Sequence, residues 1–375
     1  MNLTERRIDL MDKLNEARKI IDRVDGEMAK LFCERMRAVG MVAEAKKELG
    51  LQIFDPIREK EVVLKNSARV EDEDLKTYYI DYLNSNMAIS RAYQSRLLEG
   101  MKVAYSGVNG AFGHIAATRI FPDARAISYP DFLAAYDAVV SGECDCAVLP
   151  IENSYAGDVT QVVDRAFEGD LYINGIYDLE IVQNLLAVPG TSMEDIKEVI
   201  SHPQALSQCA NYLREKGFKT TAATNTAIAA SRVAESGRHD VAAVASLETA
   251  RLYGLQVMER HINESSNNTT RFAVFSRVEN RPTGKENQFV MFFTVKHEAG
   301  TLGKAVSVIG ENGFNLRCLK SRPTKNANWE YYFYVEGEGN LSGESGQKML
   351  RELKENCSFL KIAGAFDREK LLKEE

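Results

Sequence analysis

Apolar positions before Leu98 recur at α-helical spacing, and Pro56 and three glycines are the only helix-breaking residues among them. With Thr4 as N-cap and Gly50 as C-cap, the pattern predicts a first helix of about 45 residues, roughly 70 Å long. A helical domain of ~100 residues cannot cover such a rod. Its apolar stripe therefore predicts a homodimer in which two copies pack these helices together; the stripe comprises Leu10, Leu14, Ile21, Val24, Met28, Leu31, Val39 and Val42.

The pattern changes at Met101 and again after Arg277. Between these points short β-rich runs alternate with helical stretches, which is typical of βα units around a largely parallel sheet. A polar linker (279–286, ENRPTGKE) follows. Beyond it we predict a ferredoxin-like βαββαβ order, with strands at 288–295, Asn315–Lys320, Glu330–Val335 and 359–366 and helices at Leu302–Glu311 and Ser345–Lys354. The predicted domains are 1–100 (all-helical), 101–278 (α/β) and 287–366 (α+β).

The amino-acid composition excludes several classes of protein and of partner. The 375 residues are 45% hydrophobic and 27% charged, as in globular proteins of two or three domains. The net charge of -7 disfavours a nucleic-acid partner. No apolar run is long enough for a membrane span, and the charged start lacks a signal-peptide core, so we expect a cytoplasmic protein. The six cysteines and five histidines show no metal-ligand spacing, so we expect reduced thiols, no metal and no cofactor.

Polar residues on the first helix suggest an anion site. Arg35 and Lys46 are eleven residues apart, which places them on nearly the same face about 16 Å apart, where they could flank a small dianion. Arg18 is about 25 Å from Arg35 and a quarter-turn off that face. We therefore expect Arg18 to serve the pocket of a partner subunit.

Two further helices carry matching polar groups. A second helix starting at Pro56 would present Asp55, Arg58 and Glu59 on one face, and Ser90 and Gln94 are i, i+4 neighbours on a third. Solvated faces with surface ion pairs are the alternative. As a set, these residues together with Glu34-Arg35, Lys46 and Arg18 resemble the active-site constellation of the all-helical chorismate mutase family, over about residues 4–98.

That resemblance implies a pericyclic rearrangement of chorismate to prephenate, in which preorganised charge and shape do the work. It implies that Arg35, Arg58 and Arg18 of the partner subunit hold the substrate carboxylates, with Ser90 in support. Lys46 and Gln94 would meet the ether oxygen, where negative charge develops. Glu59 and Asp55 would bind the ring hydroxyl or orient the cations.

Several strand ends in the middle region carry small polar residues. Gly107–Gly113 (GVNGAFG) follows a strand and opens a helix, as in an anion site, although its spacing is a poor dinucleotide fingerprint. Ligand crevices lie off the carboxyl ends of strands, so we expect a two-lobed cleft for a small carboxylate; N-capping is the alternative. The polar groups are Glu152-Asn153-Ser154, Ser201-His202-Pro203-Gln204, Thr224-Asn225-Thr226, Ser246 and Asn268-Thr269-Thr270.

The segments LPIENS, SHPQALSQC, LYGLQVMER and NTTRFAVFSR resemble the prephenate dehydratase family over about residues 101–277. This implies a two-lobed, periplasmic-binding-protein-like α/β fold that eliminates water and CO2 from prephenate to give phenylpyruvate. Thr270 would assist the leaving hydroxide, and Arg271 would hold a carboxylate or structure the cleft. His202 would cap its loop or act in catalysis, and the candidate substrate contacts are Asn153, Ser154, Gln204, Thr226 and Asn268.

The C-terminal region resembles the phenylalanine-sensing ACT domain attached to such dehydratases, over about residues 287–366. The resemblance implies that phenylalanine binds at Gly300-Thr301-Leu302, Asn315-Leu316 and Ser321-Arg322-Pro323. Two residues depart from the usual pattern, Thr301 in place of Ala and Lys320 in place of Glu. Feedback inhibition is the expectation, and a domain kept for dimer contacts is the alternative.

Together these features predict a bifunctional enzyme of phenylalanine biosynthesis, because the product of the first domain is the substrate of the second. Its partners would be chorismate, prephenate, phenylalanine and further copies of itself, as a dimer or tetramer. A non-catalytic, amino-acid-responsive binding protein is one alternative, and two unrelated activities fused together is another.

Overall fold

The protein is represented by a computed structural model that describes residues 3–265, 267–280, 282, 287–324, 330–367 and 371–372. It divides into two compact units, Met1–Gly100 and Met101–Glu375. The expected linker 279–286 lies largely outside the described residues. Among the described residues, no helix is long and apolar enough to cross a membrane.

The first unit consists of three helices, α1 (Leu3–Leu49), α2 (Pro56–Ser67) and α3 (Glu73–Glu99). The predicted long helix is confirmed, and Gly50, at φ +64°, ends it. The expected N-cap is wrong, because the helix begins at Leu3 and Thr4 lies inside its first turn. The predicted start of α2 is also confirmed: Asp55 is its N-cap and accepts a hydrogen bond from the Arg58 amide at 2.9 Å.

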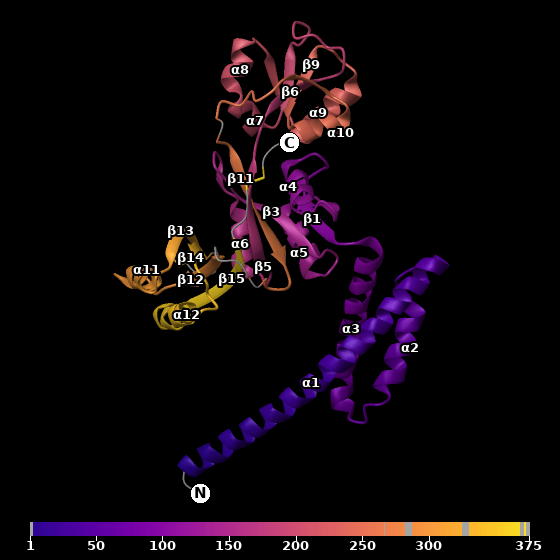
Figure 1. Ribbon diagram of the computed structural model, residues 1–375, viewed down its shortest axis with the longest axis vertical. Coiled ribbons are helices and arrows are strands. Elements are labelled where there is room, and N and C mark those ends of the chain that lie inside the picture. Colours follow the sequence, from indigo (N-terminus) through magenta and orange to yellow (C-terminus); the bar gives the residue numbers. More distant parts are fainter. Residues whose placement is uncertain are drawn as a thin grey trace. The chain divides into compact units, whose positions relative to one another are not determined.

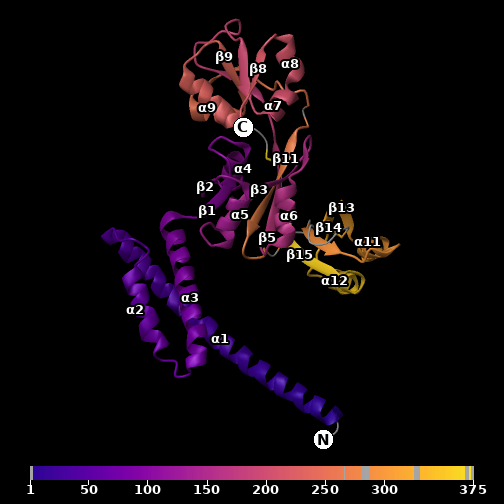
Figure 2. The ribbon, with the colours of Figure 1, turned by 180° about the vertical axis from the view of Figure 1, so that it is seen from behind.

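Helix α3 packs against both α1 and α2, while α1 runs well past their ends as a rod (Figure 1; Figure 2). Most of the predicted apolar stripe on α1 is exposed in the single chain; Leu10, Ile21 and Leu31 each expose more than half of their surface. Val39 is half-buried. The stripe is therefore available to another apolar surface along most of its length.

The second unit contains two α/β lobes (Figure 1). The first lobe has a sheet in the order β2-β1-β3-β11-β5, with β4 beside β3. Its strands are β1 (Lys102–Ser106), β2 (Arg125–Tyr129), β3 (Cys146–Asn153), β4 (Gly157–Asp158), β5 (Tyr172–Glu180) and β11 (Thr269–Ser276). Its helices are α4 (Phe112–Ile120), α5 (Phe132–Val140) and α6 (Thr160–Glu168).

The second lobe has a sheet in the order β10-β6-β9-β7-β8. Its strands are β6 (Asn184–Ala187), β7 (Glu198–Ser201), β8 (Lys219–Ala222), β9 (Val241–Ala245) and β10 (Gln256–Glu259). Its helices are α7 (Pro203–Gln208), α8 (Ala210–Glu215), α9 (Thr226–Ser236) and α10 (Leu247–Tyr253).

The expectation of a largely parallel sheet is wrong, since both sheets are mixed. Strand β1 is parallel to β2 and β3, and β7 is parallel to β8 and β9. Strand β11 pairs antiparallel with both β3 and β5, and β6 pairs antiparallel with β9 and β10. The physical reason is the chain path: β11 returns from the second lobe and enters the first sheet in the opposite direction.

The C-terminal region has the predicted βαββαβ order. Its elements are β12 (Asn287–Thr294), α11 (Thr301–Glu311), β13 (Asn315–Pro323), β14 (Tyr331–Glu338), α12 (Glu344–Asn356) and β15 (Phe359–Asp367). The antiparallel sheet has the order β13-β14-β12-β15. Ser321-Arg322-Pro323 was expected after a strand, but these residues form the end of β13.

The two faces of this C-terminal sheet bury different partners. Phe289, Met291 and Phe293 pack under α11 and α12, while the alternating residues Val290 and Phe292 join the core of the first lobe. Strand β15 runs so close to β5 that a Cβ atom added at Gly364 would meet the backbone of Ile173. The C-terminal sheet and the first lobe therefore share one core.

Candidate active sites

In the helical unit, the structure brings Arg35 of α1 to Ser90 of α3. The Arg35 guanidinium donates to Ser90 Oγ at 2.6 Å, and Ser90 Oγ donates in turn to Asn86 O. Gln94, one turn further along α3, is buried, and its Oε1 has no hydrogen-bond partner in the structure. An unpartnered buried polar atom beside a fixed arginine is typical of a place where a polar ligand binds.

The remaining predicted residues of this unit are held differently. Lys46 Nζ donates to Ile53 O at 2.6 Å, and the Asp55 carboxylate caps α2. Glu59 forms an ion pair with Arg91 of α3, and Arg91 also lies over the Phe54 ring. Sequence reasoning missed Arg91, although it lies next to Ser90.

Two predicted arginines face solvent in the single chain. Arg58 is exposed and pairs with Glu61 at 3.2 Å, and Arg18 is exposed on the part of α1 that extends beyond α2 and α3. Their guanidinium groups are therefore accessible to a ligand or to a second copy.

In the second unit, a cavity of about 370 Å³ lies between the two lobes. Four predicted contacts line it: Asn153 at the end of β3, Thr270 at the start of β11, and Gln204 and Thr226 from α7 and α9. The wall also includes residues from the predicted glycine-rich segment at the start of α4, three phenylalanine rings and further polar side chains, among them Ala111, Phe112, Gly113, Phe132, Phe272, Ser106, Asp158, Gln183, His202, Gln208, Thr224 and Asn225. Amide, hydroxyl and aromatic groups thus surround the space.

The orientation of the Asn153 side chain is fixed by backbone groups that can only donate. The amides of Tyr155 and Ala156 donate to Asn153 Oδ1 at 3.0 and 2.8 Å. The Nδ2 group must therefore be the atom that lies 2.9 Å from Thr270 Oγ1, and it donates to that oxygen. Consequently the Thr270 hydroxyl accepts from Asn153 and keeps its own proton free for another acceptor.

Two predicted contacts support this arrangement from outside the cavity wall. Ser154 Oγ donates to Asn267 O and accepts from the Thr269 amide, which ties the end of β3 to the start of β11. Asn268 is buried, and its Oδ1 accepts from Asn153 Nδ2 at 3.1 Å. Neither residue is among the described residues that line the cavity.

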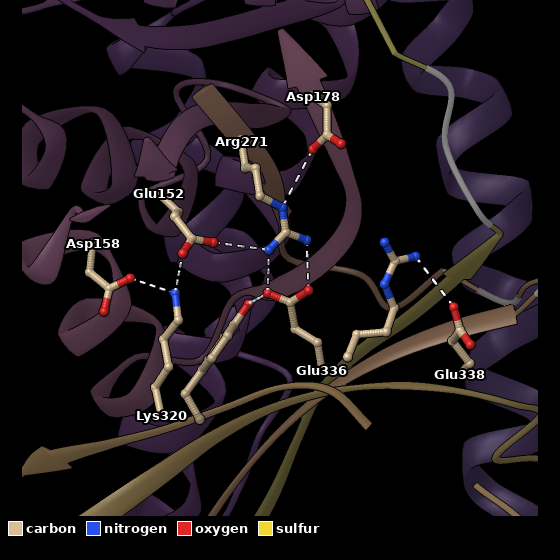
Figure 3. A network of polar contacts seen from close by, with 9 residues as sticks. Glu152, Asp158, Asp178, Arg271, Lys320, Glu336 and Glu338 are labelled. Atoms are coloured by element: carbon tan, nitrogen blue, oxygen red, sulfur yellow. Dashed lines mark hydrogen bonds and ion pairs between the residues drawn. The ribbon is translucent and has the colours of Figure 1, made fainter. Parts of the chain in front are cut away.

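Arg271 binds protein carboxylates and is not among the described cavity-lining residues. Its guanidinium donates to Glu336 of β14 at 2.6 and 2.8 Å and to Glu152 at 3.2 Å, and it lies 3.4 Å from Asp178 (Figure 3). Burial alone would lower the pKa of Arg271, but the Glu336 and Glu152 carboxylates raise it. Of the two roles expected for Arg271, this geometry favours structuring the cleft.

N-capping accounts for part of the polar pattern at the strand ends. His202 Nδ1 accepts from the Gln204 amide at the start of α7, and Asn225 and Ser246 cap α9 and α10. The capping role of His202 is thus confirmed, and because His202 also lines the cavity, a catalytic role stays a prediction.

Sequence reasoning missed four polar cavity residues, Ser106, Asp158, Gln183 and Gln208. Gln183 lies in the segment that crosses from β5 to β6; its Oε1 is buried without a partner, and its Nε2 donates weakly to Gln208 at 3.4 Å. The only available signal for Gln183 was its position just after a long strand.

A second cavity of about 750 Å³ lies in the C-terminal region. Thr301, Leu302 and Ser321 line it, and Gly300, at φ +86°, caps α11 beside it. The Thr301 hydroxyl lies within hydrogen-bond distance of two backbone carbonyl oxygens, Lys296 O and Glu298 O, to which it donates. The other predicted phenylalanine contacts, Asn315, Leu316, Arg322 and Pro323, are not among the described residues that line this cavity.

Arg322 instead bridges to the first lobe. Its guanidinium donates to the buried Asp164 of α6 at 2.7 and 3.1 Å, and Tyr332 OH donates to the same carboxylate. Asp164 raises the pKa of Arg322, which outweighs the effect of burial. This contact adds to the shared core between the C-terminal sheet and the first lobe.

Comparisons with known proteins agree with this division. The family model for chorismate mutase type II matches residues 17–95, and the model for prephenate dehydratase matches residues 103–280. Two solved structures each cover 72% of this chain. One, described as GqqA, a novel type of quorum quenching acylases, is 28% identical with a TM-score of 0.67 over 98% of its length. The other, a prephenate dehydratase in complex with L-Phe from Arthrobacter aurescens, is 26% identical with a TM-score of 0.66 over 90% of its length.

The bifunctional chorismate mutase/prephenate dehydratase of Aquifex aeolicus (strain VF5) is 33% identical to this chain over 369 residues. The match covers 95% of this chain and 98% of that relative, so it includes both units. The chain therefore belongs to the bifunctional chorismate mutase/prephenate dehydratase family.

Proposed function

We propose that the chain converts chorismate to prephenate in the helical unit and prephenate to phenylpyruvate, water and CO2 in the cavity between the lobes. Family membership over nearly the whole chain supports both activities. The observation that carries the dehydratase assignment is the Thr270 hydroxyl, which accepts from Asn153 and has its proton free inside the cavity.

In the helical unit, no proton moves during the rearrangement, so fixed charges supply the catalysis. Arg35, held by Ser90, and the exposed Arg58 would bind the substrate carboxylates. Lys46 and Gln94 would meet the ether oxygen, where charge develops as the C–O bond breaks, with Glu59 and Asp55 at the ring hydroxyl or the cations.

We further propose that Arg18 acts in the pocket of a second copy. Two features of α1 support this: its apolar stripe is exposed in one chain, and Arg18 lies on that same extended part of the helix. Packing of two such helices would bury the stripe and complete each pocket.

In the cavity, the C–O bond to the ring hydroxyl breaks as the ring carboxylate leaves as CO2, and its bonding electrons complete the aromatic ring. Thr270 O–H would donate a hydrogen bond to the departing hydroxide, and solvent supplies the net proton that makes it water. The Asn153 amide polarises the Thr270 hydroxyl for this role. Gln204, Thr226 and the amides at the start of α4 would bind the remaining polar groups of the substrate.

Phenylalanine would inhibit the dehydratase by binding at the C-terminal domain, which we assign as an ACT domain. The cavity lined by Thr301, Leu302 and Ser321 supports this, as does the solved relative that holds L-Phe. Gly300 would allow a close backbone approach at the start of α11.

The deciding experiment follows chorismate loss and phenylpyruvate formation by the purified full chain, without added metal or cofactor, with and without phenylalanine. Thr270→Val should accumulate prephenate and form little phenylpyruvate, whereas Thr270→Ser, which keeps a hydroxyl, should retain activity. Binding of prephenate without turnover by the wild-type chain would favour the non-catalytic sensor instead. A parallel assay with arogenate, read as phenylalanine formation, tests whether the cavity also accepts an amino group in place of the keto group.

A further inference from the structure

A network of charged side chains joins the C-terminal sheet to the wall of the dehydratase cavity (Figure 3). The Nζ atom of Lys320, on β13, donates to Glu152 Oε1 at 2.6 Å and also to Asp158 Oδ1. Arg271 connects Glu152 to Glu336 of β14. Two cations from different domains thus share the Glu152 carboxylate.

This network lies directly behind the catalytic residues. Thr270 pairs with Asn153 across β11 and β3, and the next pair in register is Arg271 with Glu152. Successive side chains of a strand point to opposite faces. Asn153 and Thr270 therefore face the cavity, while Glu152 and Arg271 face the C-terminal sheet.

Asp158 is one of the lining residues of the cavity, but its carboxylate lies on the same face of the hairpin as that of Glu152. Asp158 pairs with Glu152 in the β3–β4 hairpin, and its carboxylate accepts from Lys320. An unneutralised carboxylate at this place would repel a substrate that carries two carboxylates. Among the described ion pairs, the cation that contacts the Asp158 carboxylate is Lys320 of the C-terminal sheet.

The charge balance makes Lys320 important. Four carboxylates meet here, Glu152, Asp158, Asp178 and Glu336, against the two cations Lys320 and Arg271. Burial alone would raise the pKa of Glu152, but Lys320 and Arg271 together lower it. Removing Lys320 would leave three uncompensated negative charges in a partly buried place.

We propose that Lys320, although it belongs to the C-terminal domain, is a positioning residue of the dehydratase cavity. Its ammonium group neutralises Asp158 toward an anionic substrate and holds the β3–β4 hairpin so that Asn153 stays against Thr270. This inference rests on the proposed dehydratase function and extends it. Because Lys320 is followed in β13 by Ser321, which lines the C-terminal cavity, a ligand in that cavity that shifts β13 would also move Lys320.

The test compares Lys320→Met with Arg317→Met in the full chain. Methionine keeps an unbranched stem and removes the charge. Arg317 lies on the same strand and contacts Glu338 at 3.4 Å, which is not part of the carboxylate cluster, so its substitution makes the same charge change without touching the hairpin. Chorismate mutase activity of each variant reports the concentration of enzyme with a folded helical unit, and the melting temperature of the second unit reports whether that unit is folded.

We expect Lys320→Met to raise the KM for prephenate about tenfold at low ionic strength, with a smaller change in kcat. Added salt should reduce this difference, because it screens the repulsion from Asp158. Lys320→Arg should recover most of the wild-type KM, and Arg317→Met should leave it unchanged.

Addition of Asp158→Asn to Lys320→Met distinguishes charge from folding, since it removes the repelling group. A lower KM in the double variant than in Lys320→Met supports the proposal. An unchanged KM in Lys320→Met, or an equal rise in Arg317→Met, overturns it, as does a loss of folding in Lys320→Met that the second substitution fails to relieve. Absence of phenylpyruvate formation by the wild-type chain would overturn the proposed function and this inference together, whereas the other negative results overturn the inference alone.

Discussion

Asn153→Asp is the sharpest perturbation of the dehydratase cavity, because it changes hydrogen-bond polarity with almost no change in shape. An aspartate at this position can still accept from the amides of Tyr155 and Ala156, as Asn153 Oδ1 does at 3.0 and 2.8 Å. It can no longer donate to Thr270 Oγ1 at 2.9 Å. The Thr270 hydroxyl would instead donate to the new carboxylate and be withdrawn from the substrate.

The size of the effect follows from that reversed bond. A hydrogen bond to a charged group is worth about 1.5–3 kcal/mol. The bond from Thr270 to the new carboxylate would have to break before Thr270 could donate to the substrate, which would slow the reaction by a factor of about 10–100. Assistance to a leaving group typically contributes about 10²–10⁴, and part of it would be lost as well. The Asn268 Oδ1 atom, 3.1 Å from Asn153 Nδ2, would also face a like partial charge. We therefore expect kcat/KM for prephenate to fall by at least about 10².

The assay is phenylpyruvate formation from prephenate, measured as a function of pH, with chorismate mutase activity of the same sample as the internal control. The mutase rate should stay unchanged, since the helical unit is a separate compact unit. Activity of the variant should recover in part as pH falls and the introduced carboxyl regains a proton to donate. A loss of less than about threefold in kcat/KM, flat with pH, would refute the orientation argued for Asn153 and Thr270.

Lys46→Met should lower the chorismate mutase rate by about 10²–10³ and leave conversion of added prephenate unchanged; equal losses in both assays would contradict a role confined to the helical unit. Gly364→Ala should destabilise the contact between β15 and β5 by about 1–3 kcal/mol, because the new Cβ would lie 2.8 Å from the Ile173 carbonyl carbon. Calorimetry should show a lower melting temperature for the second unit, and an unchanged melting temperature would contradict the close approach of the two strands. Burial would raise the pKa of Glu152, but Lys320 and Arg271 lower it below its ordinary value near 4.5. The ionised Glu152 therefore stabilises the folded state at pH above 4.5, and this stabilisation is lost as the pH falls through the lower pKa of the folded state. Glu152→Gln should therefore flatten the acid dependence of the melting temperature, and an identical dependence in variant and wild type would argue against this ion pair.

Some predicted elements depended only on local pattern, and these were accurate. Helix α1 follows from continuous helical periodicity without a proline, and it ends at Gly50 as expected. The start of α2 follows from an N-cap followed by proline. The βαββαβ order of the C-terminal region follows from alternating strand and helix patterns.

Contacts between segments that are distant in the sequence could not be predicted from the local pattern. The antiparallel place of β11 between β3 and β5 depends on a return from the second lobe that leaves no trace in local hydrophobicity. Arg91 beside Glu59 and Glu336 beside Arg271 are likewise contacts between distant segments. Such pairs form because the fold brings the segments together, and no spacing rule links them in the sequence.

Motifs and periodicity are local properties, and they were enough to indicate the polar residues of the two candidate sites, the three successive regions and the apolar stripe on α1. Three contacts came from the fold and not from the local pattern: Asn153 donates to Thr270, Arg271 binds Glu336 of the C-terminal sheet, and Lys320 donates to Asp158. Hydrogen-bond direction and charge compensation depend on which groups share a small buried volume, and chain packing brings these groups together across 65 to 162 residues of sequence.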